Sequence, residues 1–310
     1  MKKIVALFFT IGFGTVVYAQ QLPQLTQYMI NNYAINPAIA GMHDYYQVNT
    51  TIRNQMVGIT DAPRTTILSI YGKKNDHVGL GGVVYNDQAG PTSRLGGNMS
   101  YTYHLSLSSE VKAAFALAAG FSQLKISKNG LKVLDSDDPI FQGGDIVRAV
   151  PDATFCFNTY GKNWYFGLSI PQLLSYSPDL YDRNFYDNLD EESQGKLLRH
   201  YYVLGAYKYQ IDPFWSIEPS LLLKSFKGSP TQFDIGVKTT YDDKLWFGGG
   251  YRTNGDILCL LGYTINERYM LGYSYDISTG EIGTASNGSH EFMLGIKFIT
   301  NRESDIMKMR

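Results

Sequence analysis

The sequence predicts an all-β fold, a transmembrane antiparallel β-barrel of the kind found in bacterial outer membranes. From about Tyr45 onward, segments of ~8 to 12 residues alternate between apolar and small or polar side chains, as strands between lipid and a polar lumen do. The chain holds 24 tyrosines, 16 phenylalanines and 31 glycines but only 18% charged residues, which is the averaged composition of two-faced strands. The connections between segments are alternately short and long, which is typical of a membrane barrel with two different rims.

The first residues resemble an export signal. Lys2 and Lys3 precede the apolar stretch 4–17, and Ala19 follows as a small residue at the expected cleavage point. We expect residues 1–19 to be a cleaved signal peptide and Gln20 to begin the mature chain, with no lipid anchor because position 20 is not cysteine. The rest of the chain has no apolar run near the ~18 to 20 residues of a transmembrane helix, so the strands must make any crossing.

Residues 20–44 do not alternate, and Asn36-Pro37 interrupts regular structure there. A barrel of about fourteen strands is too wide for its side chains alone to fill. We therefore expect residues 20–44 to be a periplasmic N-terminal segment folded into or beneath the lumen, as a possible plug.

The barrel itself is expected over residues 45–300, with 301–310 as a periplasmic C-terminal tail. Alternation and turn residues place about fourteen strands, near 45–57, 65–73, 77–86, 92–106, 110–125, 151–160, 163–171, 199–210, 213–225, 231–242, 244–253, 256–265, 267–276 and 289–300. The connections after even-numbered strands are all short, whereas the long ones, including 126–150 and 172–198, follow odd-numbered strands. This asymmetry predicts short periplasmic turns, longer extracellular loops and both termini in the periplasm.

Aromatic residues gather near strand ends, as in the girdles that mark the two bilayer interfaces. A soluble all-β sandwich would also use aromatic residues as strand formers, but it would not explain the export signal or the two unequal rims.

No residue pattern predicts catalysis, a metal or a cofactor. His104 and Ser106 share a strand face, as a nucleophile and its base would, but no third residue orients them and their face is luminal. Asp135, Asp137 and Asp138 lack the glycine and glutamate of a calcium loop and are interpreted as a solvated loop. The five histidines have no metal-ligand spacing. Cys156 and Cys259 are expected on opposite strand faces, as two free thiols.

Arg53 and Gln55 fall on the luminal face of the first strand, together with Asn49 and Thr51. An arginine inside a barrel needs an acidic or backbone partner wherever it is shielded from water. We expect Arg53 to fix the N-terminal segment or a loop rather than bind a solute.

Three short motifs carry a family resemblance: Gln27-Tyr28-Met29, the stretch 36–41 (Asn-Pro-Ala-Ile-Ala-Gly) and Ile52-Arg53-Asn54-Gln55. With the Asp138-Pro139-Ile140-Phe141 stretch of the middle loop, they resemble the PorP/SprF family of type IX secretion system outer-membrane proteins of Bacteroidota. The resemblance covers the mature chain in length and strand pattern, although Met56 stands where tryptophan is expected. It carries over five positions as structural or partner-facing: Asn36, Pro37, Gly41, Arg53 and Gln55.

The resemblance implies a non-enzymatic outer-membrane protein of a Gram-negative bacterium. Its partners would be a secreted protein bearing a C-terminal sorting domain, for instance a gliding adhesin, and possible periplasmic ring subunits of the secretion machine, besides outer-membrane lipid. Tyr176, Tyr181 and Tyr186 lie in a long loop and would supply contact area to such a partner.

The alternative function is a channel or transporter for small or hydrophobic solutes. The faces read as luminal are mostly Gly, Ser, Thr, Asn and Ala, which suit close packing against a plug better than ion selectivity. A net charge of −1 offers no basic surface for nucleic acid.

Overall fold

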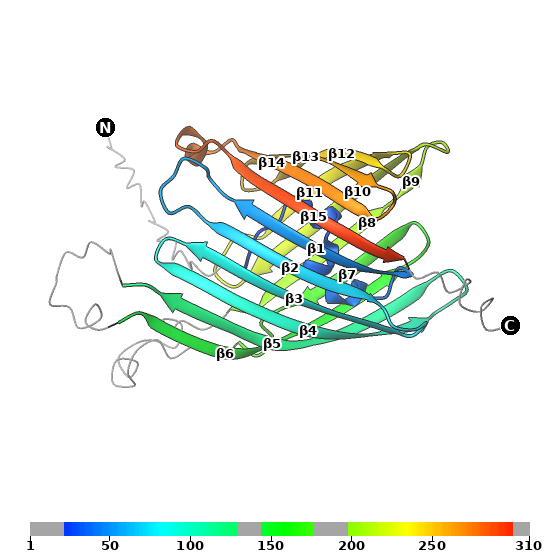
Figure 1. The fold of residues 1–310 in the computed structure, drawn as a ribbon, viewed down its shortest axis with the longest axis horizontal. Coiled ribbons are helices and arrows are strands. Elements are labelled where there is room, and N and C mark those ends of the chain that lie inside the picture. The colour runs from blue at the N-terminus through cyan, green and yellow to red at the C-terminus, as the bar shows by residue number, and fades with distance from the viewer. Residues whose placement is uncertain (1–21, 129–143, 176–197, 300–310) are drawn as a thin grey trace, which may run out of the picture.

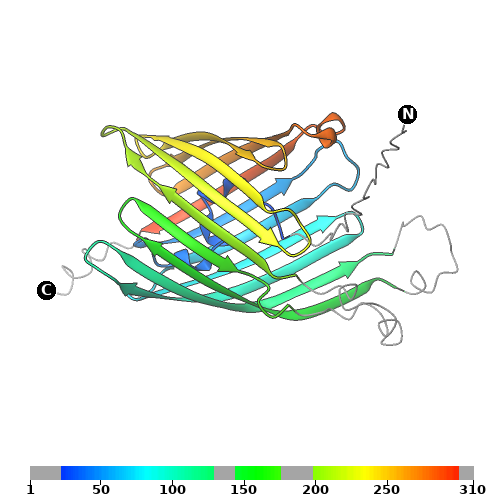
Figure 2. The same cartoon turned by 180° about the vertical axis from the view of Figure 1, so that it is seen from behind.

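The computed structural model describes residues 22–128, 144–175 and 198–299, and shows one closed antiparallel sheet (Figures 1 and 2). Each strand pairs with its sequence neighbours, β15 pairs with β1, and β10–β11 completes the ring. The short β9 continues β8 after Lys208, and both pair with β10. Counted as one strand, they make a closed barrel of 14 strands, as predicted. No helix in the described ranges is long and apolar enough to cross a membrane.

Three short 3-10 helices precede the strands, and a fourth lies before the last one. The bounds are η1 (Gln27–Met29), η2 (Asn32–Ala34), η3 (Pro37–Ile39), β1 (Tyr45–Asn54), β2 (Arg64–Lys73), β3 (Val78–Ala89), β4 (Thr92–Ser106), β5 (Lys112–Ile126), β6 (Ile146–Tyr160), β7 (Trp164–Ile170), β8 (His200–Tyr207), β9 (Tyr209–Gln210), β10 (Trp215–Phe226), β11 (Gln232–Tyr241), β12 (Leu245–Arg252), β13 (Asp256–Ile265), β14 (Tyr269–Ser278), η6 (Glu281–Thr284) and β15 (Ser289–Ile299).

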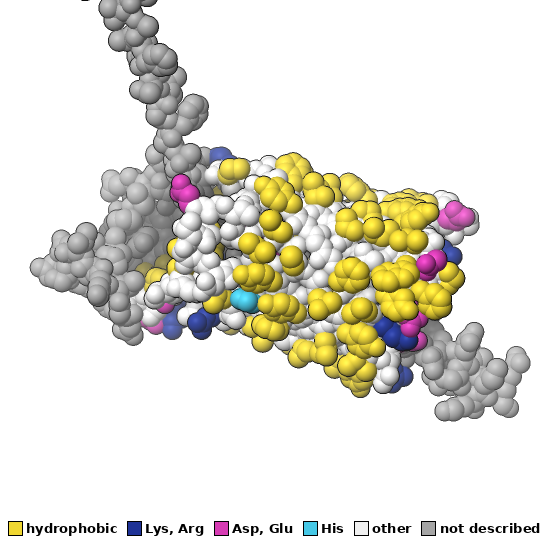
Figure 3. All heavy atoms as spheres, turned by 90° about the horizontal axis from the view of Figure 1, so that it is seen from above, with side chains coloured by type: hydrophobic (Ala, Val, Ile, Leu, Met, Phe, Trp, Pro, Cys, Tyr) yellow, Lys and Arg dark blue, Asp and Glu magenta, His cyan; other side chains and the backbone are white. Residues whose placement is uncertain are grey.

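The alternation in the sequence separates the outside of the barrel from its inside. On β4, Met99 is 81% exposed whereas the next residue, Ser100, is only 5% exposed. Hydrophobic side chains cover the visible outer wall, and charged ones gather toward its two ends (Figure 3). This apolar wall is the lipid-facing surface of an outer-membrane barrel.

The two rims differ as expected. The turn rim carries only short connections, such as 161–163 and 242–244, while the loop rim carries 127–145 and 171–199. Two loop-rim connections are shorter than expected, because β6 begins at Ile146 rather than near 151 and β3 continues to Ala89. The extra β6 residues pair with the end of β5, where Val147 and Arg148 are both exposed, so no alternation marks them in the sequence.

Residues 22–44, here called the luminal segment, lie inside the barrel and carry η1 to η3 (Figure 1). Near its start, Thr26 contacts β15 close to the loop rim, and at its end Asp44 pairs with Lys73 at the turn rim. We expected residues 20–44 to fold into or beneath the lumen and both termini to lie on one side of the membrane. The described part of the segment lies inside the lumen and runs from the loop rim to the turn rim, so the described chain begins and ends at opposite rims. The segment's buried apolar side chains pack with inward-facing strand residues, such as Tyr71 and Leu222, to form the main core of the described chain.

Candidate functional site

The luminal segment is held near the loop rim by one carboxylate. Glu291 accepts the backbone N–H of Thr26 at 2.8 Å and that of Gln27 at 3.0 Å. The Gln27 side-chain amide also donates to the Glu291 carbonyl oxygen at 3.0 Å. Hydrogen bonds from backbone N–H groups to a buried carboxylate are strong, so this contact fixes the segment's start against β15.

Arg53 ties the same point to two strands. Its guanidinium lies 2.6 Å from Asp276 and 3.1 Å from Glu291, and it donates to the Thr26 hydroxyl at 3.0 Å. The Thr26 hydroxyl in turn donates to Asp276 at 2.7 Å. Arg53 is therefore a luminal residue that fixes the segment, in the manner its position in the sequence suggested.

A second arginine, which the sequence did not single out, completes this network. Arg252 lies 3.1 Å from Asp234, 3.2 Å from Asp276 and 3.3 Å from Asp256, with no exposed side-chain surface. Lys224 lies 3.7 Å from Asp234. Together these seven ionic side chains form the luminal clamp: Arg53, Lys224, Asp234, Arg252, Asp256, Asp276 and Glu291.

Uncharged contacts continue along the middle of the segment. Asn31 accepts from Asn49 at 3.1 Å and from Ser69 at 3.2 Å. The Tyr33 ring stacks on Tyr71 with centroids 4.4 Å apart, and its hydroxyl lies 2.8 Å from that of Ser100. These partners project from β1, β2 and β4, so the middle of the segment is bonded to one side of the inner wall.

The Asn36-Pro37 motif turns the segment against the wall. Asn36 is extended, as a residue before proline prefers, and its side chain accepts from the Ala38 N–H at 3.0 Å to begin η3. The other end of the Asn36 amide donates to the Phe157 carbonyl at 3.1 Å, and Thr102 donates to the Pro37 carbonyl at 3.0 Å. Both residues are buried and bonded to the inner wall of the barrel.

At Gly41 the luminal segment passes close to the start of β3. The Gly41 φ of +88° lies in the left-handed region that favours glycine. A Cβ at the facing Gly79 would collide with the Ala40 carbonyl group, so the backbones can approach only because this position is glycine. His104 holds the same bend through a 2.8 Å contact between Nε2 and the Ala40 oxygen.

The remaining predicted residues are placed as follows. The Gln55 side-chain amide lies 3.4 Å from that of Gln24 at the loop rim. His104 uses its second ring nitrogen on Tyr160, at 2.8 Å, whereas Ser106 is exposed. Cys156 is buried and Cys259 exposed, both as free thiols, which confirms the prediction. The loop residues Tyr176, Tyr181 and Tyr186, the aspartates 135, 137 and 138, and the signal peptide lie outside the described residues.

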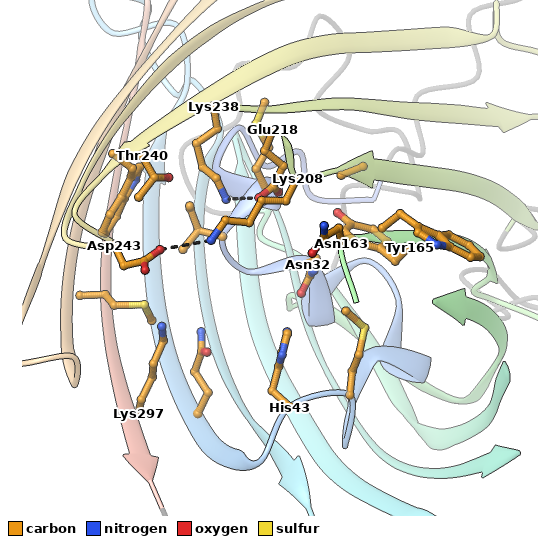
Figure 4. A pocket seen from close by; sticks show the side chains of 18 of the residues that line it. Asn32, His43, Asn163, Tyr165, Lys208, Glu218, Lys238, Thr240, Asp243 and Lys297 are labelled. Carbon is orange, nitrogen blue, oxygen red and sulfur yellow. Dashed lines mark hydrogen bonds and ion pairs between the residues drawn. The ribbon is translucent and has the colours of Figure 1, made fainter. Parts of the chain in front are cut away.

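At the turn rim the lumen is not filled. A cavity of about 280 Å³, here called the vestibule, lies between the luminal segment and the strand ends (Figure 4). Two ion pairs cross its wall, Lys238 with Glu218 and Lys208 with Asp243, each at 3.1 Å. Lys297 lines the same cavity from β15, with its ammonium 5.3 Å from the centre of the Tyr45 ring.

A closed strand ring with an apolar outer wall and a chain segment through its lumen defines the class of this protein: a transmembrane outer-membrane β-barrel with an occupied interior. The sequence model of the family described as "Type IX secretion system membrane protein PorP/SprF" matches residues 17–296. The chain belongs to this family, which makes it a membrane component of the type IX secretion class.

Solved structures share the barrel fold at low sequence identity. The chain is similar to the CymD monoaromatic hydrocarbon channel, with 8% identity and a TM-score of 0.50 over 86% of this chain and 91% of that one. It also matches a Pseudomonas aeruginosa FadL homologue, with 9% identity and a TM-score of 0.43 over 82% of this chain and 88% of that one. These likenesses concern the fold alone. No curated protein sequence matches the chain.

Proposed function

We propose that this protein is a non-enzymatic component of the type IX secretion system that helps to secrete a partner protein or attach it to the cell surface. The partner would bear a C-terminal sorting domain, as the family implies. The observation that carries the proposal is the luminal segment: a barrel whose interior is bonded to its own chain is suited to hold partners at its rims rather than to pass solutes.

In this proposal the turn rim faces the periplasm and the loop rim faces the outside, because outer-membrane barrels place their short turns on the periplasmic side. The long connections 127–145 and 171–199, the second of which contains Tyr176, Tyr181 and Tyr186, would then recognise the secreted partner. The luminal segment would act as a plug, held by the luminal clamp.

Affinity purification of the tagged barrel from native outer membranes, in mild detergent, tests the proposal. Mass spectrometry should identify one large surface protein or subunits of the secretion machine in the eluate. The first result would indicate a partner-specific attachment factor, and the second a constitutive part of the machine. Recovery of the barrel alone, both with and without chemical crosslinking before extraction, would contradict the proposal.

A further inference from the structure

The vestibule is lined by more cationic side chains than anionic ones. Its lining includes four lysines (162, 208, 238 and 297) but only two carboxylates, those of Glu218 and Asp243. Each carboxylate already pairs with one lysine. Lys297, which projects into the lumen from β15, has no carboxylate within ion-pair distance among the described residues.

A second group in the same wall lacks a partner. The indole of Trp246 lines the vestibule and is 4% exposed, and its Nε1 has no acceptor within the described part of the chain. A buried donor that stays unpaired costs free energy, so a ligand oxygen there would be favoured. The two observations are independent, and both favour a ligand that carries negative oxygens.

The shape of the vestibule favours a peptide over a free ion. Its inner end is closed by the luminal segment, which contributes Met29, Ile30 and Asn32 to the wall. Whatever enters from the turn rim must therefore leave the same way, which suits binding rather than passage. A second cavity of about 650 Å³ adjoins it and shares Met42, His43, Gly161, Lys162, Asn163 and Trp164.

The two cavities together form one groove that reaches the turn between β4 and β5. Trp164 and Tyr165 offer aromatic surface to side chains. Asn32 and Asn163 offer amides to a backbone (Figure 4).

We propose that the vestibule binds a carboxylate-bearing peptide segment of a partner protein on the turn-rim side, with Lys297 and Trp246 as donors to the carboxylate. The site lies at the opposite rim from the loops of the proposed function and does not require them. Only the statement that this partner is periplasmic rests on the proposed orientation.

Fluorescence anisotropy of a fluorescein-labelled tetraglutamate peptide, titrated with the purified full-length barrel in non-ionic detergent, tests this proposal. Tetraglutamate should bind at least about tenfold more tightly than a labelled tetraglutamine amide, because only the former offers carboxylates. Lys297→Gln should weaken tetraglutamate binding at least about fivefold, and Trp246→Phe about twofold. The control is Lys244→Gln, since Lys244 lies in a turn of the same rim, pairs with Asp242 and does not line the groove.

Equal affinity for the two peptides, no binding of tetraglutamate up to about 1 mM, or equal losses in Lys297→Gln and Lys244→Gln would each overturn the proposal. Heat-modifiable migration on gels verifies that each variant is folded. A chain ending at Ile299 provides a second arm, because residues 300–310 include Glu303 and Asp305. Unchanged affinity in that chain supports a partner peptide, whereas a gain of more than about fivefold would mean that the chain's own end occupies the groove and would overturn the proposal.

The peptide-binding measurements do not depend on what the purification from native membranes recovers. A barrel that brings down its secretion partners equally well with Lys297→Gln, yet fails to bind tetraglutamate, would contradict the vestibule site and leave the proposed function intact.

Discussion

The two ends of the lumen use charge in different ways. At the loop rim, the luminal clamp pairs Arg53 and Arg252 with carboxylates, and both arginines are buried. At the turn rim, the vestibule leaves Lys297 half-buried and without a carboxylate among the described residues. A buried network of mutually paired charges can hold a chain in one place, whereas an open site whose lysine lacks a carboxylate has room for a ligand. The comparison indicates that the loop-rim end of the lumen anchors the luminal segment, whereas the turn-rim end has room for the proposed peptide.

The largest expected effect is a difference in chemical labelling between the two ends of the luminal segment, which lie on opposite sides of the outer membrane in the proposed orientation. In a background with Cys259→Ser, cysteine at Leu22 should react with a membrane-impermeant maleimide on intact cells. Cysteine at Asp44 should react only after the outer membrane is permeabilised, because Asp44 lies at the turn rim. Labelling of both positions on intact cells, or of neither, would contradict a segment that runs from rim to rim in the proposed orientation.

Breaking the clamp should have the largest effect on stability. Arg53→Ala leaves the carboxylates of Asp276 and Glu291 without their strongest partner, and removing one side of a buried ion pair costs about 3–5 kcal/mol. Urea unfolding of the barrel in detergent, followed by gel migration, measures the loss. Arg64→Ala at the exposed start of β2 is the control, with an expected change within about 0.5 kcal/mol. Similar midpoints for the two variants would show that the clamp does not stabilise the fold.

A larger side chain at Gly79, where β3 and the luminal segment come close together, should reduce the free energy of unfolding by less than the loss of Arg53 does. Gly79→Val places side-chain atoms against the Ala40 backbone, and such overpacking costs about 1–3 kcal/mol. Gly82→Val on the same strand points outward, with no atom of the chain closer than 3.4 Å to its Cβ, and serves as the matched control. The segment should also become more sensitive to protease in the Gly79 variant. An unaffected Gly79 variant would mean that the segment does not need this contact.

The smallest expected change in stability is that of Lys297→Gln, and it distinguishes most clearly between the two ends of the lumen. Lys297→Gln should change the free energy of unfolding by no more than about 0.5 kcal/mol, because Lys297 has no buried carboxylate to leave unpaired. The same urea titration as for Arg53→Ala provides the measurement. A loss as large as that of Arg53→Ala would assign Lys297 to the structural network and remove the distinction between the two ends.

Most of the barrel could be predicted from the sequence because lipid and lumen impose opposite requirements on successive residues. The luminal face of β1 was predicted correctly, including Arg53. Its partners could not be, since Asp276 and Glu291 lie 223 and 238 residues away and only ring closure brings β14 and β15 to β1.

The vestibule was missed for a related reason. Lys238 and Lys297 each alternate with apolar residues along their strands, but no local pattern shows that β10, β11 and β15 border one cavity. The path of the luminal segment could not be predicted from the sequence either, because each of its 3-10 helices has only three residues and leaves no periodic pattern. The small residues on the luminal faces were the available signal: Gly79, Gly81, Gly167, Gly236 and Gly272 all face the segment.

The central claim is that the luminal segment closes the barrel, so that the protein works at its rims. The most direct test is the conductance of the purified full-length protein in planar lipid bilayers. The structure predicts insertion without steady current, because the chain's own residues 22–44 are bonded across the lumen. Stable, voltage-independent conductance of the intact protein would contradict the claim and would favour a channel.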